Sequence, residues 1–308
     1  MTRYLVLRID ASSRGASAAS VSKDEEREIR TILVTSEPLL LLGCGKMGGA
    51  LLRGWLDQKI AGGAGAPVHV IEPNAEAMRE FAGAPGVSHV ARAEDLPAGI
   101  KPGIVLLAVK PQMMDQGLAT MTRIAAAKPL FLSIAAGKTL AYFARHLGAD
   151  AAVVRSMPNT PASVGRGATV AVPNRHVGAA RRSQADRLLG AVGEVHWVED
   201  EGLLDAVTAL SGGGPAYVFL LIEVLAQAGI DAGLPAELAK RLARTTVCGS
   251  GELARLSPEE PATLRQNVTS PGGTTLEALK VLMAPDGLQP LFTRAIAAAT
   301  RRSRELAG

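Results

Sequence analysis

Three glycines, Gly43, Gly45 and Gly48, stand between an apolar run and a helical pattern. In that setting the first glycine permits a tight turn, the second lets a pyrophosphate approach the backbone, and the third lets the helix pack closely on the strand. The amides at the start of the helix then attract phosphate. The spacing therefore predicts a dinucleotide-binding loop made of Gly43, Cys44, Gly45, Lys46, Met47 and Gly48.

A carboxylate at position 72 follows directly on a second apolar run, 68–71. An acid at the end of this strand typically binds the ribose 2′-hydroxyl and repels a 2′-phosphate, which favours NADH over NADPH. Asn74 can cap the helix that follows and could accept either cofactor. An exposed strand-end acid without a ligand explains Glu72 equally well.

Two more apolar runs end in short loops that could contact a cofactor. Lys110 and Pro111 stop the run 104–109, and Ala135 and Ala136 stop the run 130–134. Cofactors lie along the carboxyl edge of a parallel sheet, and small residues there let a ribose or nicotinamide come close. Together with the glycine loop, these strand ends predict a cofactor track.

The segment 267–275, Asn-Val-Thr-Ser-Pro-Gly-Gly-Thr-Thr, gathers hydroxyls and backbone amides directly before an apolar helix. Such a helix start can bind a carboxylate. An elaborate helix cap is the alternative, because Ser and Thr cap helices anyway. A second glycine-rich turn at 211–215 makes capping alone less persuasive, but spacing does not decide between the two.

The cysteine and histidine spacing, the net charge and the apolar stretches exclude several kinds of partner and site. Cys44 and Cys248 are far apart, and neither they nor the five histidines show disulfide or metal-ligand spacing, so we expect a reducing cytosol and no metal. A net charge of +4 with 3% aromatics makes nucleic acid a poor partner. The strongest apolar stretch, 216–222, is well short of the 18 or so residues of a membrane span, so no membrane partner is expected.

Strand and helix patterns alternate from residue 38 to about 198, which predicts an α/β fold with an open parallel sheet. From about residue 200 only helical patterns remain, at 201–210, 216–228, 235–256, 274–283 and 289–305. We therefore expect a Rossmann-type domain at 37–199 and an all-helical domain at 200–308 that completes its core against a partner subunit. Residues 1–36 are expected to be a poorly ordered extension.

Five segments together resemble the pyrroline-5-carboxylate reductase family of proline biosynthesis. They are Gly-Cys-Gly-Lys-Met-Gly-Gly at 43–49, Ala-Val-Lys-Pro-Gln at 108–112, Ser-Ile-Ala-Ala-Gly at 133–137, Met-Pro-Asn-Thr-Pro at 157–161 and the segment 267–275. The resemblance runs in order from about residue 37 to 305, and 267–275 is its most specific part.

The resemblance implies a Rossmann domain and a helical dimerisation domain, in a homodimer or a higher assembly of dimers with sites near the interface. The residues implied for the substrate carboxylate and ring are Ser270, Gly273, Thr274 and Thr275, with the Thr275 hydroxyl near the ring nitrogen. Val109, Asn159 and Asn267 join the cofactor residues. Gly213 replaces a serine usual in relatives, and the family commonly favours NADPH, against the preference predicted from Glu72.

The implied reaction is hydride transfer from NADH or NADPH to the C=N carbon of 1-pyrroline-5-carboxylate, giving L-proline. A protonated imine is already electrophilic, so hydroxyls and amides suffice. A β-hydroxyacid dehydrogenase is the enzymatic alternative, but it needs a base such as lysine. Lys240 and Lys280, the only lysines after residue 200, lie in surface-like patterns. A non-catalytic dinucleotide sensor would leave 267–275 unexplained.

Overall fold

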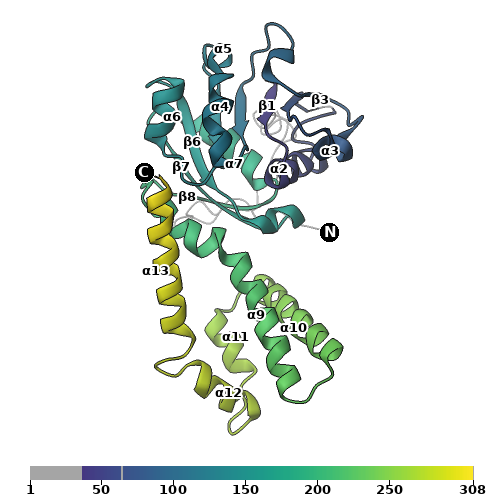
Figure 1. Cartoon of the computed structure of the whole chain (residues 1–308), viewed down its shortest axis with the longest axis vertical. Coiled ribbons are helices and arrows are strands. Elements are labelled where there is room, and N and C mark those ends of the chain that lie inside the picture. Colours follow the sequence, from purple (N-terminus) through teal and green to yellow (C-terminus); the bar gives the residue numbers. More distant parts are fainter. Residues whose placement is uncertain (1–36, 64, 308) are drawn as a thin grey trace, which may run out of the picture.

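The computed structural model describes residues 37–63 and 65–307, so the predicted extension 1–36 lies outside the described residues. Figure 1 shows a sheet layered between helices, with a group of helices extending away from it. The strands are β1 Leu39–Leu42, β2 Val68–Ile71, β3 Val87–Val90, β4 Ile104–Leu107, β5 Leu130–Ser133, β6 Ala152–Met157, β7 Gly167–Pro173 and β8 Gly193–Trp197.

The sheet has the strand order β3-β2-β1-β4-β5-β6-β7-β8. All neighbours pair in parallel except β6 and β7, so the predicted parallel sheet is confirmed with one exception. Only residues 158–166 join β6 to β7, including the short 3-10 helix η4, Thr160–Val164. A parallel crossover needs about a dozen residues or more, so this chain reverses direction instead.

The central strands are continuous apolar runs because helices cover both faces of the sheet. Leu39 and Leu41 point into one core, whereas Leu40 and Leu42 point into the other. The first core is closed by α2 (Lys46–Asp57), α3 (Ala75–Met78), η1 (Arg79–Phe81) and α7 (Ala179–Gly190). The second is closed by η2 (Ala93–Asp95), α4 (Met114–Ala119), α5 (Thr122–Ala125) and α6 (Leu140–Leu147), while the short 3-10 helix η3 (Pro111–Met113) leads into α4.

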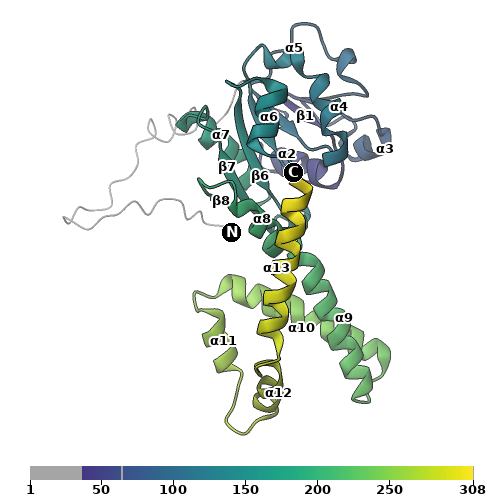
Figure 2. The same cartoon turned by 60° about the vertical axis from the view of Figure 1, so that its left-hand side comes forward.

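Within residues 198–307, all the regular elements after β8 are helices. They are α8 Leu203–Val207, the π-helix η5 Thr208–Gly212, α9 Gly214–Asp231, α10 Ala236–Leu256, α11 Pro261–Asn267, α12 Thr274–Leu282 and α13 Leu288–Ala307. Figures 1 and 2 show that α9 leads away from the sheet, that α11 and α12 form the far end, and that α13 returns to the sheet. Strand β3 and helix α11 were not predicted, because both are short and neither carries a regular apolar pattern.

The helical region leaves large apolar side chains exposed. On α9, Phe219 is 60% exposed and Leu220 56%. By length and composition alone, the helical run Leu203–Asp231, with a mean hydropathy of 1.5, could cross a membrane, and 11% of its most apolar window is buried. The prediction that no apolar stretch is long enough to span a membrane is therefore wrong when only length and composition are counted. Val224 and Leu225 extend the apolar run past Glu223.

Candidate active site

Most of the predicted cofactor residues meet because four neighbouring strands, β2, β1, β4 and β5, end in one row. Leu42 of β1 pairs with Ile71 of β2 and Leu107 of β4, and Leu107 pairs with Ser133 of β5. The next residues along each strand are therefore neighbours. They are the glycine loop 43–48, Glu72, the segment 108–111 and the segment 134–137.

The glycine loop has the shape that a dinucleotide needs. A Cβ on Gly48 would lie 2.3 Å from the carbonyl oxygen of Gly43, and Gly43 itself has a φ of +92° against the backbone of Ala108. A Cβ on exposed Gly45, by contrast, would meet no protein atom within 4 Å. The absence of side chains at Gly43 and Gly48 therefore lets α2 pack closely on the strand ends, while the space above Gly45 stays open. These residues fit a nicotinamide dinucleotide, because the open space at Gly45 leaves room for a pyrophosphate to approach the backbone.

The Glu72 carboxylate is bound to the glycine loop. The backbone N–H of Cys44 donates to Glu72 Oε2 at 2.7 Å, and that of Asn74 donates to Oε1 at 2.9 Å. Asn74 caps α3, as predicted, by accepting from the N–H of Glu76. Glu72 is half-buried. A solvated strand-end acid is therefore not the arrangement that the structure shows.

The side chain of Cys44 is buried in the protein. Burial, and secondarily the negative charge of Glu72, raise the pKa of its thiol to about 12. A thiol with this pKa stays protonated and is a poor nucleophile at neutral pH. The loop therefore contributes its backbone, and not its cysteine, to any ligand.

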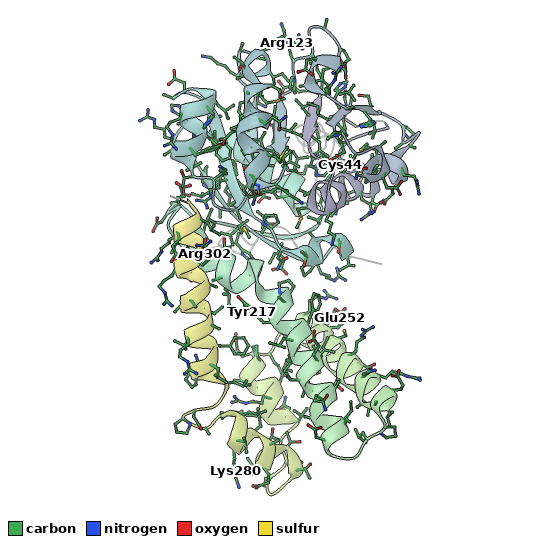
Figure 3. All side chains as sticks on the ribbon, viewed as in Figure 1. Cys44, Arg123, Tyr217, Glu252, Lys280 and Arg302 are labelled. Atoms are coloured by element: carbon green, nitrogen blue, oxygen red, sulfur yellow. The ribbon has the colours of Figure 1, made fainter. Side chains whose placement is uncertain are left out.

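A cavity of about 540 Å³ lies between the end of this track and the helices. Pro111, Ala136 and Gly137 line it from the sheet. Thr208 of η5, Tyr217 of α9 and Gly213, which joins these two helices, line it from the other side. Figure 3 shows Tyr217 and Arg302 on the part of the helical region that faces the sheet. Arg302 of α13 also lines the cavity. A ring held here would lie beside the predicted nicotinamide end of the track.

The predicted carboxylate segment does not reach this cavity within one chain. Figures 1 and 2 both place α12, which begins at Thr274, at the far end of the helical region. Ser270, Thr274 and Thr275 are exposed there. The structure therefore brings together the predicted cofactor residues of the four strand ends and leaves the predicted substrate residues apart from them.

The first turn of α12 is not capped by a side chain. Gly273 is the cap residue, and no side-chain hydrogen bond caps this end. Gly272, with a φ of +67°, turns the chain toward the helix. The hydroxyls of Ser270, Thr274 and Thr275 thus have no capping role, which weakens the alternative explanation of this segment.

Two predicted cofactor residues have protein partners in the structure. Asn159 Oδ1 accepts from the N–H of Ala168 at 2.9 Å, and its Nδ2 donates to Ser211 Oγ at 3.1 Å, so it ties the loop after β6 to η5. Asn267, at the end of α11, donates to Glu259 at 3.3 Å. Asn267 lies in the far part of the helical region, apart from the four strand ends. Their contact with a cofactor stays a prediction.

Comparison with known proteins agrees with this layout. A family model described as "Pyrroline-5-carboxylate reductase dimerisation" matches residues 201–306, and one described as "NADP oxidoreductase coenzyme F420-dependent" matches residues 39–137. The pyrroline-5-carboxylate reductase of Pseudomonas aeruginosa is 40% identical over 87% of this chain and 96% of its own length. The chain belongs to the pyrroline-5-carboxylate reductase family.

Other members of the pyrroline-5-carboxylate reductase family are similar over almost their whole length. The enzyme of Pisum sativum is 35% identical over 91% of this chain and 99% of its own. The solved structure from Coxiella burnetii has a TM-score of 0.81 at 33% identity, over 89% of this chain and 100% of that one. That from Plasmodium falciparum, solved with NADP bound, has a TM-score of 0.73 at 28% identity, over 89% and 100%. The predicted family and fold are confirmed.

Sequence patterns missed Thr208, Tyr217 and Arg302 as cavity residues. Tyr217 donates to the carbonyl oxygen of Ala209 at 2.9 Å, and its hydroxyl lies 2.6 Å from where a Cβ on Gly213 would be. In this member of the pyrroline-5-carboxylate reductase family, the tyrosine thus fills space beside the residue that replaces the usual serine. The π-helix that turns Thr208 toward the cavity has no sequence signature, although π-turns often occur at functional sites.

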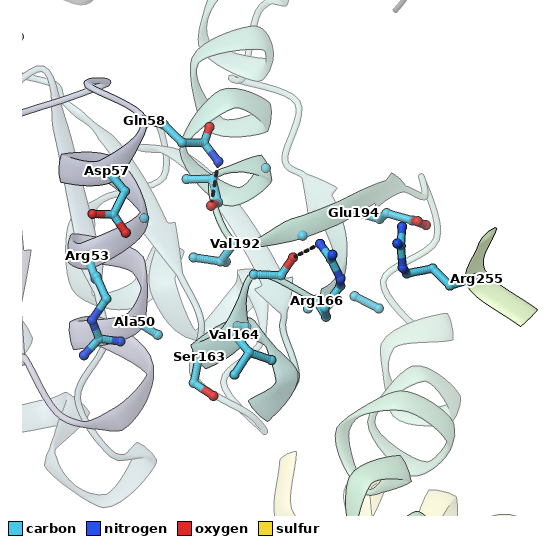
Figure 4. Close-up of a pocket in the computed structure, with 18 residues that line it drawn as sticks. Ala50, Arg53, Asp57, Gln58, Ser163, Val164, Arg166, Val192, Glu194 and Arg255 are labelled. Atoms are coloured by element: carbon cyan, nitrogen blue, oxygen red, sulfur yellow. Dashed lines mark hydrogen bonds between the residues drawn. The ribbon is translucent and has the colours of Figure 1, made fainter. Parts of the chain in front are cut away.

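A larger cavity, of about 840 Å³, contains none of the predicted site residues. Figure 4 shows it between α2, η4 and the end of α10, with Arg53, Arg166, Glu194 and Arg255 around it. It lies away from the four strand ends that form the track. Its lining of mixed charges does not match a site for a ring held between a nicotinamide and hydroxyl donors.

The lysine base of a hydroxyacid dehydrogenase has no counterpart in the described helical region. Lys240 is 61% exposed and pairs with Glu237, and Lys280 is 62% exposed and pairs with Glu277. Each ion pair joins two residues three positions apart on one helix, α10 for Lys240 and α12 for Lys280. Within residues 37–63 and 65–307, no group of three or more His, Cys, Asp or Glu side chains could hold a metal.

Proposed function

We propose that this chain reduces 1-pyrroline-5-carboxylate to L-proline with NADH or NADPH. The observation that carries the proposal is the glycine loop, closed by Gly43 and Gly48 but open at Gly45, in a row with three other strand ends that lead to the 540 Å³ cavity. The names of the relatives, which are 35–45% identical in the best cases, support the substrate. Neither observation favours a dinucleotide sensor.

The cofactor, when bound, supplies a hydride to the C=N carbon, and the ring nitrogen of the protonated imine becomes an amine. We propose that the glycine loop, Glu72, Asn74 and the strand-end residues Val109, Lys110, Pro111, Ala135 and Ala136 hold the cofactor. Asn159 and Asn267 complete the proposed set. The protein's contribution is orientation and exclusion of water, because the imine needs no nucleophile.

We further propose that 267–275 anchors the substrate. The backbone at Gly273 and Thr274, at the start of the nine-residue helix α12, would bind the carboxylate together with the Ser270 hydroxyl. Thr275, one residue further, would donate its hydroxyl to the ring nitrogen. These residues supply hydrogen bonds only, which suits a reaction without a strong protein acid.

Because 267–275 lies apart from the cavity of its own chain, we propose that a second copy of the chain supplies it. The exposed apolar side chains of α9 and the match of residues 201–306 to a dimerisation model support a homodimer. In a two-fold dimer each strand edge would then face the α12 loop of the partner. Higher assemblies of such dimers are part of the proposal.

Two coarser assignments accompany this one. We propose a division between a cofactor domain, 37–199, and a helical substrate and dimerisation domain, 200–308, since β8 ends at Trp197 and α8 begins at Leu203. We also propose a cytoplasmic location, because Cys44 and Cys248 are separate free thiols, as in reducing compartments.

The test is to mix the purified chain with 1-pyrroline-5-carboxylate and each reduced cofactor, and to follow cofactor oxidation and proline formation. Proline must appear in equal amount to the cofactor oxidised. If the reduced cofactor were oxidised with a β-keto acid but not with the imine, the chain would be a β-hydroxyacid dehydrogenase instead. If the cofactor bound but was not oxidised with either substrate, the result would support the dinucleotide sensor.

A further inference from the structure

The carboxylate of Glu72 is held by two backbone hydrogen bonds at the end of β2. One oxygen accepts from the glycine loop, at Cys44, and the other from Asn74, at 2.7 and 2.9 Å. An ionised carboxylate has about four acceptor positions, so both oxygens can accept further hydrogen bonds. The group is therefore fixed as an acceptor beside the loop proposed to bind the pyrophosphate.

In dinucleotide-binding folds this strand end lies next to the adenosine ribose. A ribose 2′-hydroxyl can donate to a carboxylate, whereas a 2′-phosphate brings negative charge against it. Since Glu72 is half-buried, water screens that repulsion less than at an open surface. The position of the carboxylate thus discriminates between the two cofactors.

The segment 72–95 also favours a cofactor without a 2′-phosphate. From Glu72 to Asp95 there are five acidic residues and two arginines, a net charge of 2 − 5 = −3, although the whole chain carries +4. Both arginines, Arg79 and Arg92, are ion-paired, to Glu76 and to Asp95. A 2′-phosphate would have to draw them away from these acids.

We propose that Glu72 makes NADH the preferred cofactor of this chain, although its cofactor domain matches a model named for NADP oxidoreductases. The inference rests on the proposed function only in requiring a nicotinamide dinucleotide in the glycine loop. It concerns the adenosine end of the cofactor, and so is independent of the substrate.

Calorimetric titration of the full chain with NADH and NADPH, without substrate, tests the proposal. We expect the wild type to bind NADH at least about tenfold more tightly. In Glu72→Gln, which keeps the size and removes the charge, NADPH should bind more tightly than it does to the wild type. Misfolding cannot produce such a gain. The control variant Glu194→Gln removes one negative charge from β8, at the opposite edge of the sheet from β2. It should leave the affinities for NADH and NADPH within about twofold of the wild-type values.

Equal or tighter binding of NADPH by the wild type would overturn the proposal, as would an unchanged NADPH affinity in Glu72→Gln. Either result would leave NADPH-dependent reduction of the imine intact, so the proposed function would survive. If neither cofactor bound, both proposals would fall. If both bound as expected but the imine were not reduced, only the proposed function would fall.

Discussion

At the scale of residues, the glycines of the loop have separable roles. Gly48→Ala would place a Cβ 2.3 Å from the Gly43 oxygen, so backbone must move, and we expect a loss of about 1–3 kcal/mol of unfolding free energy. Gly45→Ala meets no protein atom and should cost under about 1 kcal/mol, yet weaken cofactor binding at least about tenfold. Urea unfolding and cofactor titration of both variants measure the contrast. Equal effects on stability would contradict it.

Thr275 is exposed in a single chain, so its side chain has little structural role there. If its hydroxyl bonds the ring nitrogen, Thr275→Ala should lower turnover about 10- to 100-fold while cofactor affinity stays unchanged. Thr275→Ser keeps the hydroxyl and should retain most of the activity. Turnover of Thr275→Ala equal to that of the wild type would exclude this role.

The raised pKa of Cys44 predicts its chemical behaviour. With a pKa of about 12, the thiolate fraction at pH 8 is about one in ten thousand, and it grows only as the pH approaches 12. Iodoacetamide at pH 8 should leave Cys44 unmodified in the native protein and modify it after unfolding. Peptide mass spectrometry reads both states. Rapid native alkylation of Cys44 would contradict the described burial.

At the scale of elements, one ion pair connects the sheet with the start of the helical region. Arg155 on β6, with 6% of its side chain exposed, donates to Glu201 at 2.7 Å, and the same oxygen accepts from the N–H of Leu140 at the start of α6. Glu201 thus fixes the entry of α8 against the strand edge. This contact orients the helices that close the cavity.

Removing that carboxylate should therefore cost more than removing a surface charge. Glu201→Ala leaves the buried Arg155 unpaired, and we expect a loss of about 2–4 kcal/mol in urea unfolding. Glu199→Ala is the matched control, since its partner Arg182 is 38% exposed, and should cost under about 1 kcal/mol. A similar small loss in both variants would show that the pair does not hold the two elements together.

Sequence patterns located most of these elements because their signals are local. The strands around Leu42 and Leu107 are continuous apolar runs, and Asn74 caps its helix through a neighbour two residues away. The reversal at β7 and the π-turn at Thr208 depend on loop length and on packing against α13, and neither leaves a pattern in the sequence.

At the scale of the whole molecule, the site proposed here is complete only in a dimer. The Gly45→Ala chain has a damaged cofactor loop and an intact α12 loop, whereas Thr275→Ala has the reverse. If each site combines the cofactor loop of one chain with the α12 loop of the other, co-expression of the two variants should restore activity. A hybrid dimer then has one site in which the cofactor loop and the α12 loop are both intact. Random pairing predicts about a quarter of wild-type activity. Activity no higher than the mean of the separate variants would place both parts in one chain.

The residue order alone established the glycine loop, the buried strands and the unusual segment 267–275, because short-range geometry and apolar periodicity act over a few neighbouring residues. It also identified the family. Only the tertiary structure decided that Glu72 binds the backbone of Cys44, that Tyr217 and Arg302 line the cavity, and that Thr275 lies apart from it. These facts depend on strand register and helix packing between residues far apart in the chain, which no local pattern encodes.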